Sequence, residues 1–199
     1  AASDVYKRQD VDGILNADPK VFPDAVQIAE LNYLDTIELA YSGAQIIHPK
    51  TIKPLQNKNI PLYVRPFGDK RKPGTVIRRM SAPIEVPILI LKKDQVLLTI
   101  RSRDFSFVLE EKFAAIFSLL ERYRIKVNLV HNSAVNLSLC VDNSWHIDEA
   151  IQALRNEEFD VMKVENMELL TIRGYNGDLM ERYASGPEVF LLQRTQSTA

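Results

Sequence analysis

The hydrophobic period of the sequence changes repeatedly between Gln95 and Asn166, and the order of these changes limits the possible folds more than any other feature. Residues 109–123 predict an amphipathic helix, because apolar side chains recur three or four positions apart: Phe113, Ile116, Phe117 and Leu120. Residues 135–141 predict a half-buried strand, because every second side chain is apolar: Val135, Leu137, Leu139 and Val141. A helix and a strand are therefore both expected within this one segment.

Further predicted elements flank this helix and strand. Additional strands are expected at residues 95–102, 125–130 and 159–166, and a second helix at 147–156. The resulting order is β-α-β-β-α-β, which is the ferredoxin-like arrangement. The string LTIR of residues 98–101 recurs in ELLTIRGY after residue 167, which indicates an internal repeat.

In the first eighty residues the predicted order of elements is different, because strands and helices alternate. Residues 26–41 are expected to form a helix, with a Pro-Asp pair before its start and Gly43 at the left-handed position after its end. A short helix opened by Pro49 and a strand at residues 60–64 follow. This order is typical of an α/β domain.

The composition argues against several classes of function. The 25 basic residues nearly balance the 26 acidic ones, so the net charge of −1 indicates neither a nucleic-acid nor a membrane partner. Cys140 is the only cysteine and lies in an alternating run, which favours a packed strand residue and a reducing, cytoplasmic compartment. The three histidines are far apart, so no metal site is predicted, and no glycine-rich phosphate loop or serine-hydrolase string occurs.

The stretch QDVDGILNADPKVFPDA, residues 9–25, is too polar and too interrupted by proline for a helix or a buried strand. A calcium loop of the EF-hand type fails, because aligning Gly13 with its glycine places Arg8 and Pro19 where carboxylate ligands are required. Asp12-Gly13 is itself a strong turn signal. Residue types alone favour a surface turn and leave a ligand-binding loop open.

The ordered set of QDVDGILNADPK, then ELAYSGAQIIHPK, then PGTVI closely resembles the C-terminal part of the kinase domain of aspartokinases. The β-α-β-β-α-β segment that follows resembles the ACT domains that give this family its feedback control. The resemblance runs from Asp10 to the C-terminus. It implies ATP-dependent phosphorylation of the β-carboxylate of aspartate by the intact enzyme, on the route to lysine, threonine and methionine.

The resemblance also places ATP, which enters with Mg as a substrate of the intact enzyme, beside the aspartate-rich loop. Five residues stand at ATP-contacting positions: Asp10, Leu15, Lys20, Gln45 and Ile46. Lys20 would bring positive charge near the phosphates. Leu15 stands where the family has tyrosine, which removes a stacking surface, and Gln45 stands where lysine is frequent.

An amino-acid effector is the second ligand that the resemblance implies. Its expected positions are Phe105, Ser106, Asn128, Asn132, Ser133 and Ala134. Lysine-sensing members carry aspartate where Asn128 stands and glutamate where Ala134 stands. A partly desolvated ligand ammonium needs a carboxylate partner. We therefore expect weak or no lysine binding, with threonine or methionine preferred, or a pocket that has lost its ligand.

The same resemblance gives the expected domain organisation. Residues 1–9 do not match the family's preceding strand and are interpreted as foreign or mis-joined; 10–80 are the end of the kinase domain, 81–94 a linker, 95–166 an ACT domain, and 167–199 an incomplete second ACT unit. The family's catalytic residues lie upstream of this chain, so this polypeptide alone is predicted to be inactive. A homodimer is expected through residues 95–166, with 105–109 near the interface. The alternative is a non-catalytic, amino-acid-binding regulatory subunit.

Overall fold

The computed structural model describes residues 5–9, 12–44, 47–69, 71–79, 86–104, 110–184, 188–195 and 198. The chain divides into two compact units, and the chain crosses between them twice. Residues 1–91 together with 170–199 form the first unit, and residues 92–169 form the second. Two of the residue ranges with predicted functions, 45–46 and 105–109, lie outside the described residues, as does Asp10.

A four-stranded mixed sheet with the order β1-β5-β6-β4 forms the centre of the first unit. Its strands are β1 (Val5–Gln9), β4 (Glu30–Asn32), β5 (Leu62–Pro66) and β6 (Thr75–Arg78). β1 runs parallel to β5, β5 antiparallel to β6, and β4 parallel to β6. Residues 5–9 thus form a strand of this sheet, and their foreign origin stays a prediction.

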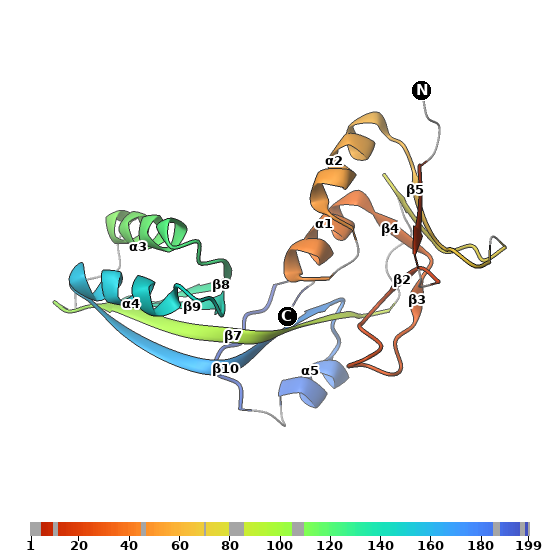
Figure 1. Cartoon of the computed structure of the whole chain (residues 1–199). Helices are drawn as coiled ribbons and strands as arrows, with labels where there is room; N and C mark the ends of the chain where they lie inside the picture. The colour runs from red at the N-terminus through yellow and green to blue at the C-terminus, as the bar shows by residue number, and fades with distance from the viewer. Residues whose placement is uncertain are drawn as a thin grey trace. The chain divides into compact units, whose positions relative to one another are not determined.

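Two helices, α1 (Tyr33–Ser42) and α2 (Pro49–Lys58), pack on one side of this sheet (Figure 1). Alternate residues of β5, Leu62 and Val64, face the shared apolar core, together with Leu39 of α1 and Ile52 of α2. Pro49 opens α2 as predicted, because the first turn of a helix does not require its missing N–H.

The predicted helix at residues 26–41 begins too early. Residues 27–28 form strand β3 (Gln27–Ile28) and residues 30–32 form β4, so the helix starts at Tyr33. The side chain of Asn32 caps it by accepting a hydrogen bond of 2.7 Å from the backbone N–H of Asp35. The predicted end is correct: Gly43 has a φ of 113°, in the left-handed region.

The second unit has the element order β7 (Ile88–Ser102), α3 (Glu110–Arg122), β8 (Val127–Asn132), β9 (Asn136–Asp142), α4 (Ile147–Asn156) and β10 (Phe159–Arg173). The sheet order β10-β7-β9-β8 confirms the ferredoxin-like β-α-β-β-α-β arrangement. α3 and α4 lie on the same side of the sheet (Figure 1).

The core of the second unit is formed by the predicted helix stripe and the predicted strand face. Ile116 and Leu120 of α3 and Leu137, Leu139 and Val141 of β9 are at most 1% exposed. Burial of an aliphatic side chain of this size stabilises the folded unit by roughly 1.5–3 kcal/mol relative to exposure of that side chain. The helical and the strand periodicity of the sequence therefore both identified side chains that pack in the same core.

Strand β10 differs from the prediction. Separate strands were expected at residues 159–166 and in ELLTIRGY, but one strand of 15 residues spans both, from Phe159 to Arg173. Helix α5 (Gly177–Ala184) follows it, and residues 188–195 contain no helix. Among the described residues, no helix is long and apolar enough to cross a membrane.

Candidate functional site

The aspartate-rich stretch forms a two-stranded hairpin in the first unit. Strand β2 (Ile14–Leu15) pairs antiparallel with β3, and the intervening residues form its loop. Leu15, predicted to contact ATP, is half-buried in β2, and Lys20 is exposed in the loop. Of the residues predicted to contact ATP, the structure describes Leu15 and Lys20, and both lie on this hairpin.

Thr75, the first residue of β6, connects this hairpin to the four-stranded sheet. Its buried hydroxyl accepts a hydrogen bond of 2.8 Å from the backbone N–H of Ile14 and donates one of 2.5 Å to the carbonyl of Ile28. Gly13 leaves room for this contact, because a Cβ there would lie 2.8 Å from Thr75 Oγ1 and 2.6 Å from Gln27 Nε2. The glycine of the DG pair thus serves close packing, and the hairpin turn lies further along.

Asn16 fixes the beginning of the loop. It is 8% exposed, and its side-chain amide donates to the carbonyl of Pro87 at 2.8 Å while its side-chain oxygen accepts from the N–H of Val26 at 2.7 Å. Its backbone N–H also donates to the carbonyl of Val26, and its carbonyl accepts from the N–H of Leu89. Every polar group of Asn16 is therefore used in positioning this loop.

Asp18 shapes the part of the loop that carries Lys20. Its carboxylate accepts a hydrogen bond of 2.9 Å from the backbone N–H of Lys20, and its carbonyl accepts from the N–H groups of Val21 and Phe22. This is the turn chemistry typical of aspartate. The Lys20 side chain is therefore exposed to solvent, while its backbone N–H is held by Asp18.

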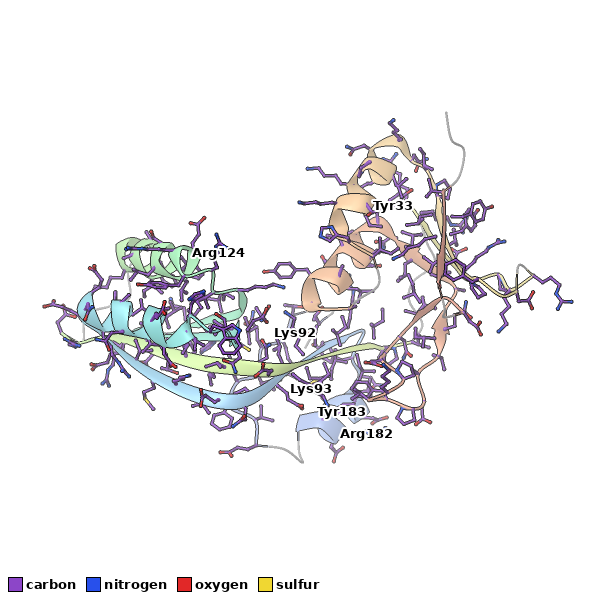
Figure 2. All side chains as sticks on the ribbon, in the orientation of Figure 1. Tyr33, Lys92, Lys93, Arg124, Arg182 and Tyr183 are labelled. Carbon is purple, nitrogen blue, oxygen red and sulfur yellow. The ribbon has the colours of Figure 1, made fainter. Side chains whose placement is uncertain are left out.

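A second polar cluster lies in the ferredoxin-like unit, around Asp142 at the end of β9. One carboxylate oxygen, Asp142 Oδ1, accepts hydrogen bonds from Asn128 at 2.6 Å, Gln95 at 3.1 Å and Lys92 at 3.3 Å. Lys92 also donates to Asn128 Oδ1 at 2.8 Å, and Asn128 donates to Gln95 Oε1 at 2.7 Å. We call these four residues the Asp142 cluster. Lys92 and its neighbour Lys93 lie on opposite sides of β7 (Figure 2).

The electrostatics of the Asp142 cluster follow from partial burial and mutual pairing. Burial raises the pKa of the Asp142 carboxyl, but hydrogen bonds from Asn128 and Gln95 and the charge of Lys92 outweigh it, so the net pKa is lowered. Burial lowers the pKa of Lys92, and Asp142 opposes that change. Burial also raises the pKa of the Cys140 thiol, so this thiol stays protonated, as expected for a packed strand residue.

The predicted effector residues separate into two groups. Asn128 occupies an irregularity in the β8–β9 pairing, between Val127 and Leu129, and belongs to the Asp142 cluster. Ser133 closes the β8–β9 turn: its hydroxyl accepts from the N–H of Asn136, and its own N–H donates to the Asn136 carbonyl. Asn132 and Ala134 are exposed beside it. The hydrogen bonds of Asn128 and Ser133 share no partner.

Sequence reasoning missed Thr75, Asn16 and Lys92. Thr75 and Lys92 act over separations of 61 and 50 residues, which only strand pairing reveals. Asn16, in contrast, follows a short apolar pair and precedes a proline-rich loop, which is a usual position for asparagine in a turn. That signal was available in the sequence.

The sequence and the fold of this chain have counterparts among known proteins. The sequence pattern of the amino acid kinase family matches residues 1–66. Lysine-sensitive aspartokinase 3 of Escherichia coli K12 is 31% identical over 189 residues, covering 91% of this chain and 41% of that protein. Chloroplastic aspartokinase 3 of Arabidopsis thaliana is 36% identical over 143 residues, covering 68% of this chain and 24% of that protein.

A solved structure agrees with these relatives. The crystal structure of Escherichia coli aspartokinase III in complex with aspartate and ADP is 28% identical, with a TM-score of 0.73 over 89% of this chain and 41% of that one. The fold and the hairpin thus define the end of an amino acid kinase domain joined to a ferredoxin-like unit. The chain belongs to the aspartokinase family. It spans less than half the length of the relatives that it matches.

Proposed function

We propose that this chain is part of an aspartokinase that transfers the γ-phosphoryl group of Mg-ATP to the β-carboxylate of aspartate. The observation that carries this proposal is the β2–β3 hairpin, which includes Leu15 and Lys20. Hydrogen bonds of Thr75 and Asn16 hold this hairpin in place. Phosphoryl transfer depends on positioning both reactants and neutralising charge. In this proposal the chain contributes one side of the nucleotide site, and the remaining catalytic groups come from the upstream part of the enzyme.

The direct test of this proposal is ATP binding by the purified chain. Lys20→Gln removes the exposed loop cation, and we expect it to weaken ATP affinity by about tenfold, since a hydrogen bond to a charged group contributes roughly 1.5 kcal/mol or more. Lys58→Gln, a change at an exposed lysine of α2, is the matched control and should leave the affinity unchanged. Equal affinities of the two variants would refute the role of Lys20.

The chain alone should not phosphorylate aspartate, because half of the proposed apparatus is absent from it. ADP release that depends on aspartate, measured above a heat-killed control, would contradict this expectation. The intact reading frame, expressed as one protein, should release ADP and form an acyl phosphate that hydroxylamine traps. The single cysteine of this chain supports our proposal that the enzyme acts in a reducing, cytoplasmic compartment.

We further propose that the ferredoxin-like unit binds an amino acid other than lysine. Asn128 already accepts a hydrogen bond from the Lys92 ammonium, and Ala134 offers no polar group. Calorimetric titration with lysine, threonine and methionine tests this proposal. Threonine or methionine should bind more tightly than lysine, and micromolar affinity for lysine would overturn it.

We also propose that the unit mediates a homodimer. β8 and β10 are the edges of its four-stranded sheet, and exposed edges present unpaired backbone groups that a second copy can cover. Val130 of β8 is 39% exposed on one such edge. Sedimentation should show a dimer at micromolar concentration and a monomer for Val130→Lys. A monomer of the unaltered chain at high micromolar concentration would count against the dimer.

A further inference from the structure

A cavity of about 730 Å³ lies in the first unit, away from the hairpin that carries the proposed nucleotide residues. It opens between α1, α2 and the end of β6. Its lining residues are Ile37, Lys50, Lys53, Gln56, Asn57 and Arg79. Three of these are cations, two are carboxamides, one is aliphatic, and none is acidic.

The fold fixes the walls of this cavity. α1 begins directly after β4, and Arg79 follows the end of β6; because β4 and β6 are parallel, both ends lie at the same edge of the sheet. The hydroxyl of Tyr33, labelled in Figure 2, donates a hydrogen bond of 2.7 Å to the carbonyl of Ile60 and ties α1 to the segment after α2. The cavity is therefore held between packed elements.

The cations of α2 share one helical face. Lys50, Lys53 and Asn57 are spaced at i, i+3 and i+7, so their side chains project in the same direction. Gln56 adds a second carboxamide to the same wall. The wall thus offers two ammonium groups and two amide groups, all of which can donate hydrogen bonds.

The positive charge of this cavity is not neutralised within the described part of the chain. None of the side chains of Lys50, Lys53 and Arg79 forms an ion pair with a described carboxylate. Arg78, which adjoins Arg79 in the sequence, does have such a partner: it pairs with Glu30 at 2.6 Å. Cations held close together without counter-charges attract anions into the space between them.

We propose that this cavity binds a phosphorylated small molecule. Lysine ammonium groups are mobile point charges that adapt to phosphate oxygens, and the arginine guanidinium binds two such oxygens at once. The carboxamides of Gln56 and Asn57 can donate to further oxygens, while Ile37 supplies apolar contact for the rest of the ligand. The volume lies within the range of roughly 300–1,000 Å³ that is usual for small-molecule pockets.

This site is distinct from the proposed nucleotide loop. Thr75, at the start of β6, holds the hairpin, whereas Arg79 lies just past the end of the same strand. Four residues of extended strand separate them by about 13 Å. The two positions lie at opposite ends of the strand, so the proposed site is separate from the hairpin that carries Leu15 and Lys20.

Calorimetric titration of the purified chain with pyrophosphate at low salt tests the proposal. The double variant Lys53→Gln, Arg79→Gln should bind pyrophosphate at least about tenfold more weakly, since each lost charge-assisted hydrogen bond contributes roughly 1.5 kcal/mol or more. Lys58→Gln, on the same helix outside the cavity, is the matched control and should bind like the unaltered chain. Unfolding curves establish that all variants are folded.

Other outcomes overturn the proposal. An equal loss in Lys58→Gln would show diffuse attraction to α2, and equally tight binding of citrate would show a general anion site without preference for phosphate. Failure of pyrophosphate to bind at millimolar concentration would remove the site altogether. If Lys20→Gln abolishes binding and the double variant does not, pyrophosphate occupies the nucleotide loop, which supports the proposed kinase function while refuting the second site.

Discussion

Replacing Thr75 by valine should destabilise the first unit and loosen the β2–β3 hairpin. Valine has nearly the shape of threonine, so packing around this fully buried residue is preserved while its hydroxyl is lost. The hydroxyl bridges the Ile14 N–H and the Ile28 carbonyl, over hydrogen bonds of 2.8 and 2.5 Å. Thr75→Val therefore isolates the contribution of this bridge to the stability of the hairpin.

The expected magnitude follows from the buried groups that lose a partner. Leaving a buried donor or acceptor unsatisfied costs about 1–3 kcal/mol, so the two backbone groups together should cost roughly 2–3 kcal/mol, the carbonyl contributing less. For a chain of this size that corresponds to a decrease in Tm of about 4–12 °C. Because Ile14 adjoins Leu15, the affinity for ATP should fall as well.

Urea unfolding gives the free energy, and hydrogen exchange of the Ile14 amide localises the effect. Thr75→Ser is the matched control, because it keeps the hydroxyl and loses one methyl group, at a cost of about 0.8 kcal/mol. The valine variant should be the less stable of the two and should lose protection of the Ile14 amide. If valine is as stable as serine, or if that amide stays protected, the bridge does not hold the hairpin.

Three further predictions concern other contacts. The folded pKa of Asp142 is lowered, so its contribution to stability is present above the unfolded pKa and is lost as the pH falls below about 4. In Asp142→Asn, the unfolding free energy of the second unit should therefore depend less on pH in the acid range. Parallel pH profiles of the two proteins would contradict this. Arg173 pairs with the largely buried Asp35 and with the half-exposed Glu38, so Arg173→Met should cost roughly 3 kcal/mol. The cost should be smaller in an Asp35→Asn background, where only Glu38 remains as a charged partner, and additive costs in a double-mutant cycle would exclude coupling. The rings of Tyr183 in α5 and Phe22 meet edge to face, with centroids 6.2 Å apart, so Tyr183→Ala should cost at least about 0.5–1.5 kcal/mol of stability. Because the Phe22 N–H donates to the Asp18 carbonyl, this variant should also weaken ATP binding. Unchanged ATP affinity would show that the contact does not position the loop.

Local patterns predicted those parts of the fold in which one period dominates. The stripe containing Ile116 and the alternation containing Leu139 both became core faces, because burial at those positions is decided by the period itself. The start of α1 was misplaced since Ile28, Leu31 and Leu34 fit a helical spacing equally well. Strand pairing of Ile28 with Ile14 and of Leu31 with Ile77 overrides that spacing.

The candidate sites show the same division between local and long-range information. Asp18 and Lys20 form a local turn, and the loop was recognisable from its residues. Lys92, in contrast, was assigned to a linker, because nothing near it in sequence indicates a charged partner. Its contacts with Asn128 and Asp142 depend on how three strands align, and a shift of one residue in any of them would point the side chains to the other face.

Lys92 changes the physical basis of the effector prediction. From the sequence, lysine was expected to bind weakly because Asn128 and Ala134 supply no carboxylate. The structure places a carboxylate beside Asn128 after all, that of Asp142, but its Oδ1 already accepts three hydrogen bonds, one from the Lys92 ammonium. Lys92 is only 15% exposed, so a free ammonium that approached Asn128 would have to displace a partly buried one or lie against a like charge. A neutral side chain meets neither obstacle at that position, so the proposed discrimination against lysine rests on the Lys92 ammonium as well as on the lack of acidic side chains at positions 128 and 134.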